Sequence, residues 1–216
     1  MGLITLLEPQ KKNPQRFNVH LDNQFAFGIS AELAFEERLK VGMKLTEKEV
    51  EGLVEKDQVR RLVEKAVRFL GYRPRSEKEL RDYFLYRGKI RDLTSEEERG
   101  KYLTSVEAAI EKVKKLGYLN DKEFAGWWTS QREEFKKSSA RQLKLELMKK
   151  GISKELIEET LSTGMSEEEK ALAIATKKAR FLSALPKKEF KIKMGQFLAR
   201  KGFDWELIKK IVDRLS

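Results

Sequence analysis

Residues 117–132 read GYLNDKEFAGWWTSQR, and this stretch joins two helices. Gly117 suits the left-handed position at which helices commonly stop, and Asn120 or Asp121 can cap the following helix by accepting its free N–H groups. Aromatic residues then recur at steps of three and four, at Phe124, Trp127, Trp128 and Phe135. This spacing makes one helical face strongly aromatic. Such a face either packs against neighbouring helices or forms a base-stacking or partner-anchoring surface, and we expect core packing.

A second pattern repeats along the chain. Two apolar residues one helical turn apart are followed by a glycine after one further turn, in Leu80-x3-Phe84-x3-Gly88, Leu143-x3-Leu147-x3-Gly151 and Met194-x3-Leu198-x3-Gly202. This spacing is typical of an amphipathic helix that ends at a glycine. A basic residue precedes each glycine, where it favours the negative end of the helix dipole: Arg87, Lys150 and Lys201. We therefore predict a mainly α-helical protein built as a tandem array of three three-helix modules.

The predicted modules span residues 58–118, 119–162 and 167–216, and the first contains an insertion near residues 92–104. Residues 1–57 have a different pattern, because Arg16–Leu21 and Gln24–Gly28 alternate between apolar and polar positions. With the apolar run Leu3–Leu7 they predict a small antiparallel β meander, turned at Asp22-Asn23. Short helices should follow, and one of them is opened by the capping box Thr46-x-x-Glu49. A separate helix is expected from Val59 to Leu70, and Ser76-x-x-Glu79 is a further capping box.

Charge divides the chain in the same way as the patterns. Residues 1–57 hold 8 Lys/Arg against 10 Asp/Glu, whereas the remainder holds 38 against 25, a net of +13. A polyanionic partner would meet the helical part, although interleaved acidic residues also fit a mixed-charge surface that only aids solubility. The chain has no cysteine, no run long enough to span a membrane and no signal sequence at Leu3–Leu7, so we expect a cytoplasmic protein.

The sequence holds no recognisable catalytic constellation. There is no cysteine nucleophile and no Walker loop, and the one histidine, His20, lies on the polar phase of its predicted strand. The acidic runs Glu96–Glu98 and Glu167–Glu169 follow Ser95 and Ser166, where helix capping explains them. We expect no enzyme activity, no metal and no cofactor.

The opening stretch carries a family resemblance. Gly117-Tyr118-Leu119-Asn120-Asp121-x2-Phe124-Ala125-x2-Trp128-x3-Arg132 resembles the most recognisable motif of the RecX family, bacterial regulators of the RecA recombinase. Three further segments resemble other signatures of the family, in order: Arg73-x-Arg75-Ser76-x2-Glu79-Leu80, Lys149-Lys150-Gly151-Ile152 and Arg200-Lys201-Gly202-Phe203. The resemblance covers residues 58–216, and residues 1–57 resemble an extension that some members carry. Two features depart from the pattern: the insertion, and Asn120 where acidic residues are usual.

The resemblance implies a non-enzymatic regulator that acts in homologous recombination, DNA repair and the SOS response. Such proteins bind the RecA–DNA filament in its helical groove and restrain filament extension, ATPase activity, strand exchange and co-protease activity. We expect a monomer, because the array ends in ordinary amphipathic helices. Basic residues of the second and third modules are the expected contacts with the filament: Arg132, Lys136, Lys137, Arg141, Lys144, Lys149, Lys150, Lys187, Lys188, Lys191, Arg200 and Lys201. The expected motif or core positions are Leu80, Gly117, Tyr118, Leu119, Asp121, Phe124, Ala125 and Trp128.

Two other functions fit the residues alone. Three-helix modules resemble helix-turn-helix units, so the chain could be a DNA-binding helical-repeat protein that acts independently of RecA. If about 4–6 phosphates were neutralised, the logarithm of its DNA affinity would fall with the logarithm of salt at a slope of about −4 to −5. A scaffold for an unrelated acidic protein is a third possibility, but it leaves the motifs unexplained.

Overall fold

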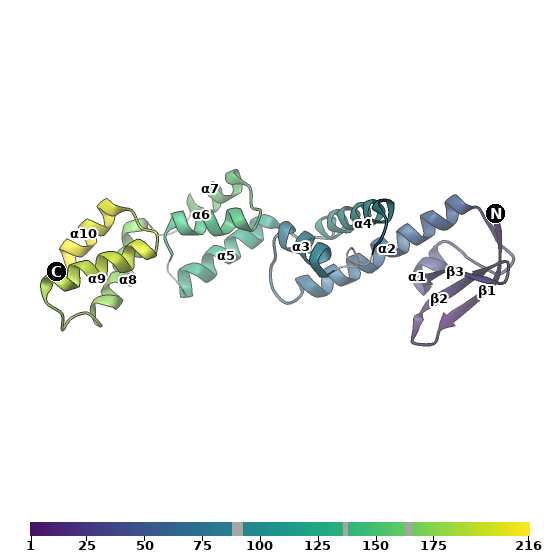
Figure 1. Cartoon of the computed structure of the whole chain (residues 1–216), viewed down its shortest axis with the longest axis horizontal. Helices are drawn as coiled ribbons and strands as arrows, with labels where there is room; N and C mark the ends of the chain where they lie inside the picture. The colour runs from purple at the N-terminus through teal and green to yellow at the C-terminus, as the bar shows by residue number, and fades with distance from the viewer. Residues whose placement is uncertain (88–92, 136–137, 163–165) are drawn as a thin grey trace. The chain divides into compact units, whose positions relative to one another are not determined.

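The computed structural model describes residues 1–87, 93–135, 138–162 and 166–216 (Figure 1). This part of the chain contains a four-stranded sheet and ten helices, and the first helix comes before the fourth strand. The chain divides into two compact units. The first unit comprises Met1–Tyr72 and Leu80–Tyr118, and the second comprises Arg73–Glu79 and Leu119–Ser216.

The N-terminal sheet confirms the predicted meander. Strands β1 (Gly2–Gln10), β2 (Asn13–Leu21) and β3 (Gln24–Ser30) are antiparallel neighbours, and a short strand β4 (Lys44–Leu45), which the sequence pattern did not indicate, pairs with β1. Asp22 and Asn23 both have positive φ, 49° and 66°, as a two-residue hairpin turn requires. One face of the sheet packs on helix α1 (Ala31–Glu36) and on the start of α2 through a buried core: Ile4, Val19, Phe27, Ile29, Leu33 and Leu53.

Helix α2 is a single helix over Glu47–Leu70, and here the prediction of two shorter helices was wrong. The capping box at Thr46 is present as predicted. The segment contains no proline, and Gly52 faces open space, so nothing interrupts the helical hydrogen bonding. One end of α2 therefore packs on the sheet while the other belongs to the first three-helix module.

A buried carboxylate ties α2 to the sheet. Asp57 is 3% exposed and accepts two hydrogen bonds from the Arg16 guanidinium, at 3.1 and 2.6 Å. Its Oδ1 also accepts the backbone N–H of Ser30 at 2.8 Å. Because every partner is a donor, the charge of Asp57 is compensated inside the core.

The first module consists of the end of α2, helix α3 (Glu77–Arg87) and helix α4 (Glu96–Lys115). From residue 96 onward the insertion forms the first turns of α4 after the cap at Ser95, as the capping pattern predicted. Gly88 and Asp92 lie outside the described residues. The core of this module is formed by Leu80, Phe84, Val106 and Ile110.

The second unit contains six helices that form the second and third modules, so the predicted fold class is confirmed. Gly151 and Gly202 adopt left-handed φ values of 82° and 85° where their helices end. Phe124 is fully buried, and Trp127 and Trp128 pack beside it, so the aromatic face of α5 lies against the core. No helix among the described residues is long and apolar enough to cross a membrane. The helices are α5 (Asp121–Phe135), α6 (Ala140–Lys149), α7 (Lys154–Ser162), α8 (Glu167–Ala179), α9 (Lys187–Arg200) and α10 (Trp205–Leu215).

Candidate functional site

The motif residues meet at a joint within the second unit, between the segment Arg73–Glu79 and the end of α6. The buried Ser76 hydroxyl donates to the carbonyl oxygen of Lys150 at 2.7 Å. The next residue, Gly151, has a left-handed backbone, and a Cβ there would lie only 2.7 Å from Cβ of Lys78. Glycine is therefore required twice at this position, by its φ angle and by the close approach of the neighbouring segment.

Glu79 supplies the charge at the centre of this joint. Arg73 donates to both carboxylate oxygens, at 2.9 and 3.0 Å, and the Lys150 ammonium donates to the same carboxylate. Burial acts to raise the pKa of Glu79, but the hydrogen bonds from Arg73 and Lys150 outweigh it and hold the pKa below its ordinary value. The sequence placed Glu79 in a capping box and in a family signature, but its pairing with Lys150 was not predicted, because the two residues lie 71 positions apart.

Two cations stack on Trp128 next to this carboxylate. The guanidinium carbon of Arg132 lies 4.2 Å from the ring centroid, and Lys150 Nζ lies 5.0 Å from it. Glu146 Oε2 accepts from both Arg132 Nε (2.6 Å) and Trp128 Nε1 (2.9 Å). Arg132 and Lys150 therefore act inside the second unit, where cation–π and charge-paired contacts hold them.

A second joint of the same kind connects the second and third modules. The backbone N–H of Ser139 donates to the carbonyl oxygen of Lys201 at 3.3 Å. A Cβ on the left-handed Gly202 would lie 2.7 Å from Ser139 Oγ. Ala140 N donates to Glu167 at 2.8 Å, and in the first joint Glu77 N donates to Asp121 at the same distance.

In both joints, the first N–H of a middle helix thus donates to a carboxylate at the start of the next module. These contacts between modules were not predicted from the sequence, although the position of the serines in the repeat indicates them. Ser76 precedes Leu80 by four residues, and Ser139 precedes Leu143 by four, so each serine stands at the same place in its repeat.

The remaining motif positions have different environments. Asn120 caps α5 by accepting from the N–H groups of Lys122 and Glu123, whereas Asp121 acts in the first joint. Tyr118 is a motif position outside the core: it follows the left-handed Gly117, and its side chain is 56% exposed. Trp128 is half-buried, and four positions are fully inside: Leu80, Leu119, Phe124 and Ala125.

The candidate cations fall into several classes. Lys144 pairs with Glu158 at 3.5 Å, and Lys191 pairs with Asp213 at 2.7 Å. Lys201 Nζ lies 6.0 Å from the ring of Phe197. Lys136 and Lys137 lie outside the described residues. Five candidates are exposed and form no ion pair with any residue that the structure describes: Arg141, Lys149, Lys187, Lys188 and Arg200.

These five cations all lie on the middle helices of their modules, α6 and α9. Lys149 and Arg200 occupy equivalent positions, since each precedes the terminal glycine of its repeat by two residues. Exposed cations at a repeated position suit an anionic or acidic surface that itself repeats. Across the described part of the chain, no group of three His, Cys, Asp or Glu residues is placed to hold a metal ion.

Four family models match the chain. They are the regulatory protein RecX N-terminal domain at residues 2–46 and the first, second and third three-helix domains of RecX at residues 63–88, 120–161 and 166–212.

Whole-chain relatives agree with these models. The regulatory protein RecX of Clostridium botulinum (strain Eklund 17B / Type B) is 34% identical over 98% of this chain and 95% of its own length. That of Clostridium beijerinckii is 31% identical over 100% and 96%. A crystal structure of regulatory protein RecX shares the fold with a TM-score of 0.71 at 23% identity, over 99% of this chain and 100% of that one. RecX from Lactobacillus salivarius matches with a TM-score of 0.58 at 26% identity, over 74% and 97%. The chain therefore belongs to the RecX family of regulatory proteins.

Proposed function

We propose that this chain regulates the RecA recombinase by binding the RecA–DNA filament and restraining its extension, ATP hydrolysis, strand exchange and co-protease activity. The observation that carries the proposal is membership of the RecX family over nearly the whole chain. We further propose that the chain acts in the cytoplasm as a monomer, and as a regulator without catalysis of its own.

The exposed cations of the middle helices are the proposed contacts with the filament. A single exposed ion pair contributes about 0–1 kcal/mol, so no one residue carries the binding. Contacts from several modules of one chain add through effective concentration, provided that the modules are held at fixed spacing. Arg132 and Lys150 contribute indirectly in this scheme, because they maintain the first joint.

The competing function is DNA binding without RecA, which the net charge of +13 beyond residue 57 supports. The two differ in their dependence on salt. Binding to bare single-stranded DNA should weaken with salt at a slope of about −4 to −5 if about 4–6 phosphates are contacted. A protein that recognises RecA should remain on a preformed filament after bare-DNA binding is lost.

Fluorescence anisotropy of the labelled chain, measured against a RecA filament and against the same oligonucleotide alone, separates these functions. The proposal requires retention on the filament at a salt concentration that abolishes binding to the oligonucleotide. Parallel loss of both signals would support the DNA-binding function instead. The charge-reversed variant of Lys149 and Arg200 is the internal check, because both residues are exposed and lie outside the joints.

A further inference from the structure

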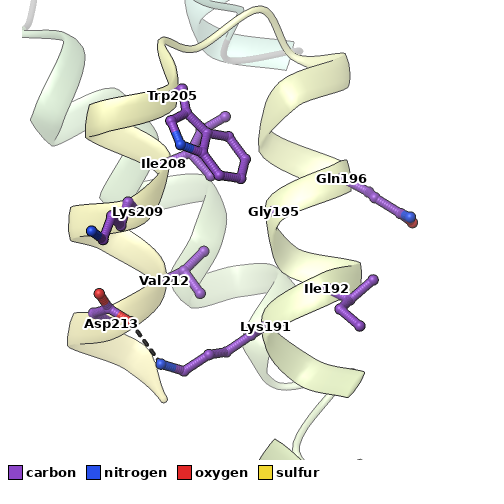
Figure 2. A pocket seen from close by; sticks show the side chains of 9 residues that line it. All are labelled: Lys191, Ile192, Gly195, Gln196, Trp205, Ile208, Lys209, Val212 and Asp213. Carbon is purple, nitrogen blue, oxygen red and sulfur yellow. Dashed lines mark hydrogen bonds and ion pairs between the residues drawn. The ribbon is translucent and has the colours of Figure 1, made fainter. Parts of the chain in front are cut away.

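The third module has an open groove between α9 and α10 (Figure 2). Its volume is about 390 Å³, and aliphatic side chains from both helices line it, including Ile192, Ile208 and Val212. Trp205, the first residue of α10, lies at one end and is 71% exposed. Ile192 is 52% exposed, so the groove presents large apolar side chains to solvent from both helices.

The second module carries a side chain at the position that corresponds to the wall of this groove. Counting back seven residues from the terminal glycine gives Gly195 in the third module and Lys144 in the second. Lys144 reaches across to Glu158 of α7, at 3.5 Å, whereas Gly195 leaves the corresponding space empty of side chain. A Cβ at Gly195 would meet nothing closer than Cγ2 of Ile208, at 3.8 Å. Packing therefore does not require glycine there, and its presence keeps the groove open.

The first turns of α7 and α10, the helices that follow the terminal glycines, also differ in polarity. Three residues after the glycine, the second module has Lys154 and the third has Trp205. Compared with the second module, the third therefore has Trp205 in place of Lys154 at the end of the groove. It also has Gly195 in place of Lys144 along the wall of the groove. Both differences make this surface more apolar than its counterpart.

Two lysines also line the groove. Lys209 lies one helical turn after Trp205 on α10, and Lys191 Nζ lies 2.7 Å from Asp213 at the end away from Trp205 (Figure 2). The hydrogen bond and charge of Lys191, followed by the charges of Lys209 and Lys187, lower the pKa of Asp213. Lys191 and Lys209 line the groove against the single carboxylate of Asp213, so its rim has a positive excess that an acidic partner would complement.

We propose that the groove between α9 and α10 binds an acidic amphipathic peptide segment of the RecA filament, with a bulky apolar side chain beside Trp205 and carboxylates beside Lys191 and Lys209. The inference rests on the proposed function and gives the chemistry of one contact within it. A peptide fits better than nucleic acid, because base stacking uses successive aromatic faces and the groove has one aromatic ring among aliphatic side chains.

Photo-crosslinking identifies the occupant. The full-length chain carries benzoylphenylalanine in place of Ile192 and is irradiated on RecA filaments formed on end-labelled single-stranded DNA. The expected product joins position 192 to an acidic segment of RecA, as read by mass spectrometry. The same crosslinker at Phe35, which is 86% exposed in the first unit, is the matched control and should not give this product.

Each other result overturns the inference in a distinguishable way. A crosslink from position 192 to the labelled DNA would assign the groove to nucleic acid. A chain that binds the filament without any crosslink from position 192 would show that the groove is not used. A chain that does not bind the filament at all would overturn the proposed function itself, and the inference with it.

Two variants supply an independent readout. Trp205→Ala should weaken filament binding about tenfold to a hundredfold, because a buried apolar contact is lost. Phe181→Ala removes an aromatic ring that is 81% exposed in the same module and should leave binding unchanged. The double variant Gly195→Lys with Lys209→Glu recreates the lysine–glutamate pair of the second module and should close the groove with a similar loss. Unchanged binding in both groove variants, with unchanged circular dichroism, would refute the proposal.

Discussion

Replacing Glu79 with glutamine should weaken the first joint of the second unit substantially. The variant keeps the size of the side chain but leaves Arg73 and Lys150 without their shared counter-charge. Removing one partner of a fully buried ion pair costs about 3–5 kcal/mol. The Glu79 side chain is 12% exposed and its two partners are each 30% exposed, so solvent compensates part of the loss. We expect a cost of about 2–3 kcal/mol.

Urea unfolding followed by tryptophan fluorescence measures this cost. Trp127 and Trp128 lie beside the joint, and a Trp205→Phe background removes the only other tryptophan. With a urea dependence of about 1–3 kcal/mol per molar, the midpoint should fall by about 0.7–3 M. Glu159→Gln is the matched control in the same unit, because it breaks an ion pair between Glu159 and Lys122, whose side chains are 57% and 68% exposed. It should cost less than about 1 kcal/mol.

The effect of Glu79→Gln should also depend on pH. Because the pKa of Glu79 is lowered in the folded state, its stabilising contribution is complete above the unfolded value of 4.5 and is lost as pH falls through the folded value. The difference between the parent chain and the variant should therefore be full near pH 7 and should shrink progressively as the pH falls below 4.5. A midpoint shift no larger than that of Glu159→Gln, or one that does not change with pH, would refute the role assigned to Glu79.

Three further variants test other parts of the account. Gly151→Ala should destabilise the second unit by about 2–4 kcal/mol, because it adds a steric clash to an unfavourable φ angle. Gly117→Ala has the same backbone strain without the clash and should cost about 1 kcal/mol. Equal urea midpoints for the two variants would contradict this. Asp57→Asn should lower the stability of the first unit by about 3 kcal/mol, measured by thermal unfolding in far-ultraviolet circular dichroism, and an unchanged transition would exclude the buried anchor. Reversing the charge of Lys149 and Arg200 together should weaken RecA inhibition while helicity stays constant, and full inhibition by the variant would remove these positions from the contact surface.

The features predicted well from the sequence are those written in local patterns. The spacing of apolar residues and glycines fixes where the middle helices end, and Gly151 and Gly202 have the left-handed backbone that this spacing implies. The alternation in residues 16–28 and the turn at Asp22-Asn23 define a hairpin through short-range geometry alone. These signals act within a few residues, so one sequence was enough to interpret them.

The continuity of α2 was not predicted. The net charge and the apolar pattern both change near residue 57, and we therefore predicted that one helix ends and another begins there. A helix can bury different faces against different neighbours along its length, and local periodicity does not indicate this. Leu53 packs with the sheet, while Leu62 and Ala66 are buried farther along the same helix. The change in pattern therefore marked a change of packing partner and not a break in the helix.

The roles of the candidate cations required the structure. Periodicity indicates the face on which a lysine lies, but not the carboxylate that meets it from another helix. Arg132 reaches Glu146 and Lys144 reaches Glu158, and neither pairing follows from spacing within one helix. The groove of the third module was missed for a related reason, since Gly195 and Trp205 acquire significance only when α9 and α10 lie side by side.

The most direct test of the central claim is the rate of DNA-dependent ATP hydrolysis by the RecA of the same organism, titrated with this protein. The account predicts inhibition, together with loss of strand exchange, and inhibition at substoichiometric protein would favour action at filament ends over coating of the filament. An unchanged rate at equimolar protein, alongside tight and salt-sensitive binding to bare DNA, would contradict the account and support a DNA-binding protein that acts without RecA.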